Sequence, residues 1–386
     1  MDIRKDFPIL KRGTYFDNSA TSHKPKQVLD AVVDYYNNHN ANIHRGIHSL
    51  SEESSEMYEQ SKKTLAKFIG INDWKDIVYV KNATEGLNMA SHLLNLSKND
   101  KVVTTIMEHH SNFLPWKVNS QISIVDISSE GLINMTDFQE KIKGAKVVAL
   151  SHASNVLGTI NPVEELTKMA HEEGAKVVID AAQSAPHIKL NVSKIKPDFL
   201  AISGHKMLAP GGTGLLYVNK AVSEGPPYIL GGGTVFDISD AGVEWADMPE
   251  RLEGGTPNIG GAIGFAEAAK YLMNIGMENV RKHELSLLNE FFKLNKEGLV
   301  NIYGPSSLNI RTGLVSFNVP GVHAHDVADF LNARKIFIRS GKHCAHPLHK
   351  RLCISSSARA SFYIYNTISE VKNLFEVLGE IKEVFS

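Results

Sequence analysis

The sequence predicts an α/β protein, with a mostly parallel seven-stranded sheet in a large domain and a smaller α+β domain after it. Seven short apolar runs rich in Val and Ile recur between residues 76 and 218, as expected for strands that are buried on both faces. Amphipathic segments such as 162–174 separate these runs, which indicates helices that pack on the sheet.

The predicted elements follow in order along the chain. The strands are expected at 76–80, 101–106, 121–127, 146–151, 176–182, 198–203 and 214–218. After two glycine-rich segments the pattern changes to a helix near 262–276, weaker strands at 313–319 and 336–340, and a terminal helix that includes 376–386. We therefore expect a large domain over 15–264 and a small domain formed by 1–14 and 265–386.

Composition narrows the class of ligand. The 386 residues are 42% hydrophobic and 22% charged, which is enough for a large core. With 41 basic and 42 acidic residues and no long basic run, neither nucleic acid nor an anionic membrane is an expected partner. The first residues lack a signal-peptide core, and no stretch approaches the ~20 apolar residues of a membrane span, so a cytoplasmic protein with a small ligand is expected.

Polar residues stand where several predicted strands end. Lys206 follows the strand at 198–203, and Asp180 and Gln183 follow the strand before it. The carboxyl ends of parallel strands are where α/β sheets bind ligands. A lysine that can form a Schiff base, together with an acid that can keep a pyridine nitrogen protonated, predicts pyridoxal phosphate.

Three further strand ends supply what that cofactor needs. Ala83 and Thr84 lie in a turn before a predicted helix, whose N-terminal amides favour a phosphate. His109 offers an imidazole for the ring face, and Asn155 an amide for the ring's phenolic oxygen or a substrate carboxylate. Each residue alone has a simpler explanation as a helix cap, a loop residue or a surface lysine. Their convergence on one sheet edge favours the cofactor site.

These residues belong to a series of motifs that spans nearly the whole chain. The motifs are YFDNSAT, NIHRGIHSLS, NATEGLN, MEHHSN, SHASNVLGT, IDAAQ, SGHKM, GGGT, EGGTPN, RSGKHCA and ARASFYIYNT. In this order they resemble the SufS-like group of cysteine desulfurases, which have the class V aminotransferase fold, within the pyridoxal phosphate-dependent fold type I.

The resemblance implies a role for each matching residue. Lys206 would carry the cofactor, Asp180 would pair with its pyridine nitrogen, and His109 would stack on its ring. Gln183 and Asn155 would hold the phenolic oxygen. The implied phosphate ligands are Ala83, Thr84, Ser203, His205 and, from the partner subunit of a homodimer, Thr256. The implied substrate contacts are Ala20, His44, Asn155, Arg339 and Arg359, with Arg359 holding the substrate carboxylate.

The motif RSGKHCA aligns Cys344 with the family's nucleophile, and Lys342 stands where the family has a histidine. A cation at this position would favour the thiolate form. Burial in a core and a zinc site are the competing interpretations of Cys344. Cys353 matches no catalytic position and is expected to be a packing residue. Arg45 and His48, beside His44, are further candidates for the entrance of the site.

The expected activity is therefore conversion of L-cysteine to L-alanine, with a persulfide formed on Cys344. The sulfur would pass to a SufE-like or SufU-like acceptor protein, or to an iron–sulfur scaffold, for iron–sulfur cluster assembly. The alternatives are a selenocysteine lyase, another class V aminotransferase or lyase, and, in a different class, a metal-binding scaffold built on the His and Cys residues.

Overall fold

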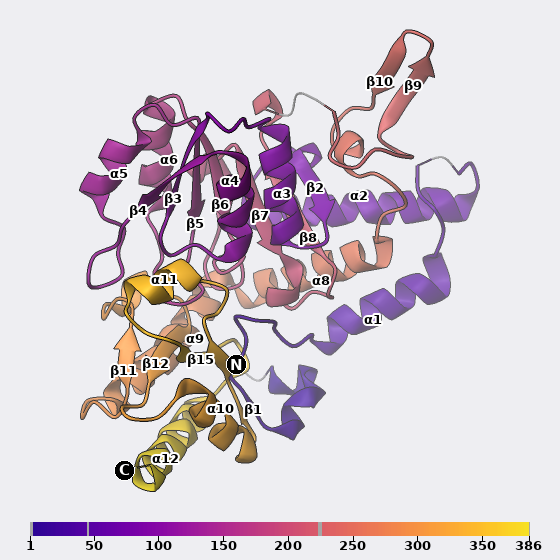
Figure 1. Ribbon diagram of the computed structural model, residues 1–386. Coiled ribbons are helices and arrows are strands. Elements are labelled where there is room, and N and C mark those ends of the chain that lie inside the picture. Colours follow the sequence, from indigo (N-terminus) through magenta and orange to yellow (C-terminus); the bar gives the residue numbers. More distant parts are fainter. Residues whose placement is uncertain (1–2, 45, 223–225, 386) are drawn as a thin grey trace.

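A seven-stranded sheet dominates the computed structural model, which describes residues 3–44, 46–222 and 226–385 (Figure 1). The strand order is β2-β8-β7-β6-β5-β3-β4. β8 runs antiparallel to both of its neighbours, and the other pairs are parallel. The strands are β2 Ile77–Val80, β3 Lys101–Thr105, β4 Gln121–Val125, β5 Val147–Ser151, β6 Lys176–Asp180, β7 Phe199–Ser203 and β8 Gly214–Val218. The predicted fold class is confirmed, because each of the seven apolar runs forms one strand of a mostly parallel sheet.

Helices bury both faces of this sheet. In β5, Val147 and Ala149 pack on the face covered by two helices, α3 (Ala83–Leu93) and α4 (Leu114–Asn119). The alternate residues Val148 and Leu150 pack on the opposite face. That face is covered by α2 (Ser49–Ile69), α5 (Met135–Ile142), α6 (Val163–Glu172), α7 (Val192–Ile195) and α8 (Ile259–Ile275). Burial on both faces explains why the strands are continuous apolar runs.

Local chemistry sets the helix ends that matter for the site. The Asn82 side chain accepts a hydrogen bond of 3.0 Å from the Glu85 amide and starts α3 directly after β2. This is the role that the N-cap position favours for asparagine. At the other end of the sheet, α2 stops at Gly70, which has φ +74° and caps the helix in a left-handed conformation.

A second, antiparallel sheet has the order β11-β12-β15-β14. Its strands are β11 Asn301–Tyr303, β12 Leu314–Asn318, β15 Ser357–Ser361 and β14 Arg339–Gly341. The helices α9 (Met277–Leu294), α10 (Ala324–Ala333) and α12 (Ile368–Val384) share a separate core with it. The predicted strand at 336–340 divides in two, because β13 (Ile336–Phe337) pairs with β1 (Thr14–Tyr15) while β14 pairs with β15.

A hairpin and two short helices complete the fold. A hairpin of β9 (Val235–Ser239) and β10 (Gly242–Trp245), which the sequence did not predict, projects from the body of the molecule (Figure 1). Helix α1 (Lys26–Asp34) precedes α2, and α11 (His346–Arg351) follows the Cys344 loop. We propose a large domain over 15–264 and a small domain formed by 1–14 and 265–386. These limits stay a prediction. In the ranges that the structure describes, no helix has the length and apolar character to cross a membrane.

Candidate active site

A cavity of ≈ 330 Å³ lies where β5, β6 and β7 end and the Cys344 loop approaches them. It gathers side chains from the large sheet, from the N-terminal segment and from the antiparallel sheet. The predicted site residues that line it are Ala20, Ala83, Thr84, His109, Asn155, Asp180, Gln183, Ser203, His205, Lys206, Arg339, Cys344 and Arg359. The topology therefore brings together residues that are separated by more than three hundred positions in the sequence.

Lys206 ends a short turn directly after β7, and its side chain is half-buried. Burial lowers the pKa of its amine from 10.5 to about 8, an effect that nearby Asp180 opposes and Arg359 reinforces. A far larger fraction of this amine is therefore unprotonated at neutral pH than for an ordinary lysine. An unprotonated amine can attack a carbonyl carbon, as a Schiff-base lysine must.

Asp180 and Gln183 follow the neighbouring strand β6. Asp180 is buried, which raises the pKa of its carboxyl, and it accepts a hydrogen bond of 2.9 Å from the Ala182 amide. The Gln183 side chain donates to the Ser19 carbonyl at 2.8 Å. Its Oε1 is buried without a partner among the described residues. A buried acceptor of this kind needs a donor, and a bound ligand can provide one.

His109 directly precedes the short turn His110–Asn112, and its Nδ1 accepts a hydrogen bond of 3.1 Å from the Ser111 amide. The neutral ring therefore carries its proton on Nε2. Burial, followed by the charges of Lys206, His110 and Arg359, lowers the pKa of His109 to about 3. The imidazole is thus neutral at physiological pH, a state that suits packing against an aromatic ring.

The N-terminus of α3 lines one part of the cavity and has the features that suit an anion. The Ala83 amide donates to Ser203 Oγ at 2.9 Å, and the hydroxyls of Thr84 and Ser111 lie 2.6 Å apart. His205 also lines this cavity. Hydroxyls beside the first turn of an eleven-residue helix provide both donors and a favourable dipole for a phosphate.

Arg359 lies on β15 with only 3% of its surface exposed. Its Nη1 donates to the Asn155 carbonyl at 2.9 Å, and its Nε has no partner within the described ranges. Burial lowers the pKa of Arg359 to about 10, so the group stays cationic at neutral pH. A buried guanidinium with a free donor is suited to a carboxylate ligand.

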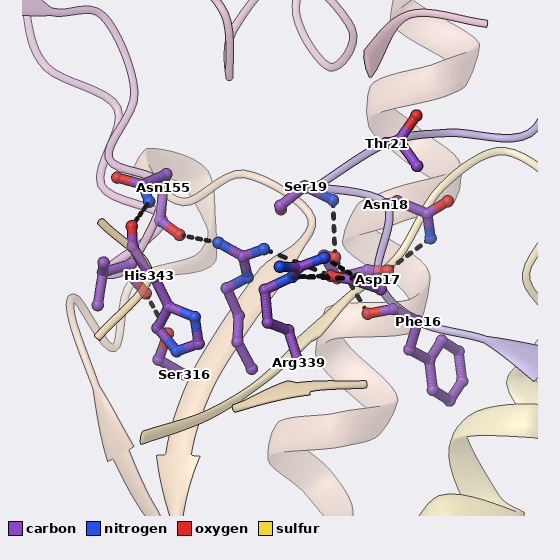
Figure 2. Close-up of polar contacts among 12 residues, drawn as sticks. Phe16, Asp17, Asn18, Ser19, Thr21, Asn155, Ser316, Arg339 and His343 are labelled. Carbon is purple, nitrogen blue, oxygen red and sulfur yellow. Dashed lines mark hydrogen bonds and ion pairs between the residues drawn. The ribbon is translucent and has the colours of Figure 1, made fainter. Parts of the chain in front are cut away.

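Asp17 is a residue of this site to which the sequence pattern assigned no role. Its carboxylate contacts Arg339 at 2.9 to 3.1 Å (Figure 2). It also lies 3.5 Å from Arg359 Nη2. Asp17 and Arg339 are 322 positions apart, so no local periodicity could have joined them. The available signal was the motif YFDNSAT, in which Asp17 is the one ionisable acid.

The Cys344 loop has an unusual backbone that polar contacts hold in place. His343 and Cys344 have φ values of +48° and +55°, which are rare for residues with a side chain. Asn155 Nδ2 donates to the His343 carbonyl at 2.7 Å (Figure 2), and the His110 amide donates to the Cys344 carbonyl at 2.8 Å. The Asn155 amide group is thus engaged by the loop, so its predicted contact with the ring's phenolic oxygen stays a prediction.

The two cysteines are both free and exposed. Exposure of Cys344 contradicts its interpretation as a core residue and leaves the thiol accessible from the cavity. The prediction that Cys353 packs in the interior is wrong. Cys353 follows the end of α11 in a left-handed turn with φ +56°, and its side chain is exposed in this turn before the chain enters β15. Among the residues that the structure describes, no group of three or more His, Cys, Asp or Glu side chains is arranged to hold a metal ion.

Two of the predicted site residues line a different cavity from the one described above. His44 and Thr256 line a separate cavity of ≈ 500 Å³, together with Val235 and Phe236 of the hairpin. His48 caps α2 through a hydrogen bond that its Nδ1 accepts from Ser51. Arg45 lies outside the described residues.

The cavity fits pyridoxal phosphate. It has an amine of lowered pKa, a buried carboxylate, a neutral imidazole and a helix N-terminus with hydroxyls, which match the aldehyde, pyridine nitrogen, ring face and phosphate. Gln183 Oε1 has no partner among the described residues, so it remains available to accept a hydrogen bond from the ligand.

Comparison with known proteins identifies the relatives of this chain. A model of the family described as aminotransferase class-V matches residues 14–374. The chain is 46% identical to a probable cysteine desulfurase of Pyrococcus abyssi, with 98% of this chain and 97% of the relative covered. It is 42% identical to a cysteine desulfurase of Haloferax volcanii, with 100% and 97% covered.

Solved structures agree in fold. The apo structure of a cysteine desulfurase from Thermococcus onnurineus NA1 superposes with a TM-score of 0.94 at 44% identity, covering 100% of this chain and 97% of that one. The Escherichia coli cysteine desulfurase CsdA superposes with a TM-score of 0.91 at 29% identity, covering 99% and 98%.

Proposed function

Because this chain belongs to the class V aminotransferases and, within them, to the pyridoxal phosphate-dependent cysteine desulfurases, we propose that Cys344 receives the sulfur of L-cysteine. The reaction converts L-cysteine to L-alanine and leaves a persulfide on the Cys344 thiol. One observation carries the assignment: the exposed Cys344 and the amine of Lys206 line the same cavity.

The proposed roles of the protein groups follow from their chemistry. Arg359 binds the substrate carboxylate, since its guanidinium is buried, cationic and incompletely partnered. When bound, pyridoxal phosphate acts as an electron sink for the bonds at the substrate Cα. Lys206 removes the Cα proton, which its lowered pKa favours at neutral pH. We also assign to His109, which is neutral with its proton on Nε2, the exchange of a proton with the substrate thiol.

Cys344 completes the sulfur transfer. Its thiolate attacks the substrate sulfur, so that the Cβ–S bond breaks, an S–S bond forms and the carbon skeleton leaves as alanine after protonation. No external oxidant is needed, because the substrate carbon accepts the electron pair of the broken bond. The contacts of Asn155 and the His110 amide with the loop support this role, since they hold the backbone of Cys344 beside the cavity.

The purified protein tests the proposal directly. Incubation with L-cysteine and a reductant should release alanine and sulfide, and without reductant mass spectrometry should find +32 Da on the peptide that carries Cys344, the mass of one sulfur atom. Cys344→Ala should retain the yellow cofactor and lose alanine release. Cys353→Ala is the matched control, because it removes the other exposed thiol. Normal desulfuration by Cys344→Ala would overturn the assignment.

We also propose that the protein is a homodimer in which Thr256 reaches the cofactor phosphate of the partner subunit. The apolar side chains of Phe236, Ile238 and Ile47 are 77%, 69% and 97% exposed, which is costly in a lone chain. Phe236 and Thr256 both line the second cavity. Light scattering should give twice the chain mass, and Phe236→Asp with Ile238→Asp should lower it.

The sulfur acceptor that we propose is a SufE-like or SufU-like protein or an iron–sulfur scaffold, which places the enzyme in iron–sulfur cluster assembly. The exposure of Cys344, with exposed Lys342 and His346 beside it, supports transfer to another protein. A cytoplasmic location is proposed with it, because Cys344 must be a free thiol to receive sulfur and a reducing compartment keeps thiols in that form. A transfer assay with labelled sulfur would distinguish these acceptors.

A further inference from the structure

The two arginines that line the cavity oppose each other across neighbouring strands. In the antiparallel pair β14–β15, Arg339 and Arg359 are direct cross-strand partners. Side chains at such positions lie on the same face of the sheet, and like charges there repel. Arg359 is 3% exposed, so water screens its charge little. The pairing therefore needs a compensating group.

Asp17 is that group. Arg339 Nε donates to both carboxylate oxygens at 3.1 Å, and its Nη2 donates to Oδ2 at 2.9 Å. The other guanidinium, of Arg359, approaches Oδ1 at 3.5 Å. Figure 2 shows the carboxylate of Asp17 against Arg339, with Asn18 and Ser19 following it along the N-terminal segment.

The position of Asp17 is fixed from outside the arginine pair. Asn18 Nδ2 donates to the Ser361 carbonyl at 2.6 Å, and the Ser19 amide donates to Ser361 Oγ at 2.9 Å. Asp17 itself forms a parallel bridge with Ser361, at the end of the strand that carries Arg359. A carboxylate held by its backbone in this way stays near the arginines whether or not a ligand is bound.

The charges then decide what the cavity accepts. Two guanidinium groups and one carboxylate have a net charge of +1. The unpartnered Nε of Arg359 can donate a hydrogen bond to an anionic ligand. Elsewhere in the cavity, the charge of Lys206 is opposed by that of Asp180. The net charge of the two arginines and Asp17 is therefore balanced by one singly charged anionic group.

We propose that Asp17 is a positioning residue that cancels one of the two arginine charges, so that the site accepts a ligand with one carboxylate, as L-cysteine has. The inference rests on the proposed role of Arg359 as the carboxylate site. Without Arg339, Asp17 pairs with Arg359 alone and competes with the substrate carboxylate. Without Asp17, two uncompensated cations favour a ligand with two negative charges.

Three variants of the holoenzyme test this: Arg339→Gln, Asp17→Asn and the double variant. Arg339→Gln should raise the KM for L-cysteine about tenfold, since a charged contact on Arg359 is worth about that factor. The double variant leaves one arginine and no competing carboxylate, so its KM should return to within about threefold of the wild type. A merely structural role for Asp17 would make the double variant worse than Arg339→Gln, and that result would overturn the inference.

A binding measurement separates this inference from the proposed function. Calorimetry gives the affinity of each protein for malonate, a dianion, and for acetate. The ratio of the malonate affinity to the acetate affinity should be at least about fivefold higher in Asp17→Asn than in the wild type. This readout needs no turnover, so it tests the charge inference even if no alanine is released. An unchanged malonate-to-acetate ratio would refute the inference. Asp126→Asn is the control, because it breaks the exposed Asp126–Arg351 pair and should change neither value.

Discussion

The lowered pKa of Lys206 predicts how the apo protein captures its cofactor. With a pKa of about 8 the amine is about 9% unprotonated at pH 7, against about 0.03% for a lysine at 10.5. Only the unprotonated amine attacks an aldehyde, so the reactive fraction is about 300-fold larger than for an ordinary lysine. The rate of capture should rise with pH and level off above about pH 8.

The perturbation that tests the cause is Asp180→Asn. The carboxylate of Asp180 raises the pKa of Lys206, opposing the larger effect of burial, so its loss should shift the midpoint to lower pH. The assay follows imine absorbance after apo protein is mixed with pyridoxal phosphate at pH 6 to 10, with borohydride trapping and mass spectrometry to locate the linkage on Lys206. A midpoint above pH 9.5 in the wild type, or a midpoint that moves upward in Asp180→Asn, would refute the reasoning.

Three other predictions follow from single contacts. The His109 ring, with its pKa lowered to about 3 by burial, should show no titration between pH 5 and 9 in NMR of ring-labelled apo protein, and a shift near pH 6.5 would contradict its burial. Arg359→Lys should raise the KM for L-cysteine at least about tenfold with a smaller change in kcat, measured by alanine release, because the bidentate fork is lost. Glu253→Gln should destabilise the fold by roughly 3 to 5 kcal/mol in urea unfolding, since Lys62 is 1% exposed and pairs with Glu253 at 2.8 Å. The exposed pair Arg334–Glu380 is the control, and a Glu380→Gln change above about 1 kcal/mol would contradict this account.

The fold and most of the cavity could be predicted because the relevant signals are local. A buried parallel strand is a short apolar run, and the residues that leave its carboxyl end meet at one edge of the sheet. This is why Lys206, Asp180 and Asn155 were recognised from their positions after three such runs. The nucleophile loop was recognised by its motif, although the sheet pattern alone does not bring Cys344 to the cavity.

What escaped the sequence depends on contacts between distant segments. The prediction that Cys353 packs in the interior was wrong because its neighbours in sequence do not reveal that its side chain is exposed in the turn after α11. The β9–β10 hairpin was missed because its strands are mostly exposed, so they lack the apolar run that marks the others. His44 and Thr256 belong to another cavity, where the hairpin lies beside them.

The seven buried strands of the large sheet, the lysine and the acid at their ends and the motif around Cys344 could be read from the sequence, since each is specified by residues within a few positions. The contacts of Asp17 with Arg339 and Arg359, and of Asn155 with the Cys344 loop, are visible only in the folded chain. Pairing of charges and satisfaction of buried polar groups depend on distance in space and not on distance along the chain. Segments more than three hundred residues apart come within hydrogen-bonding distance only once both sheets have packed.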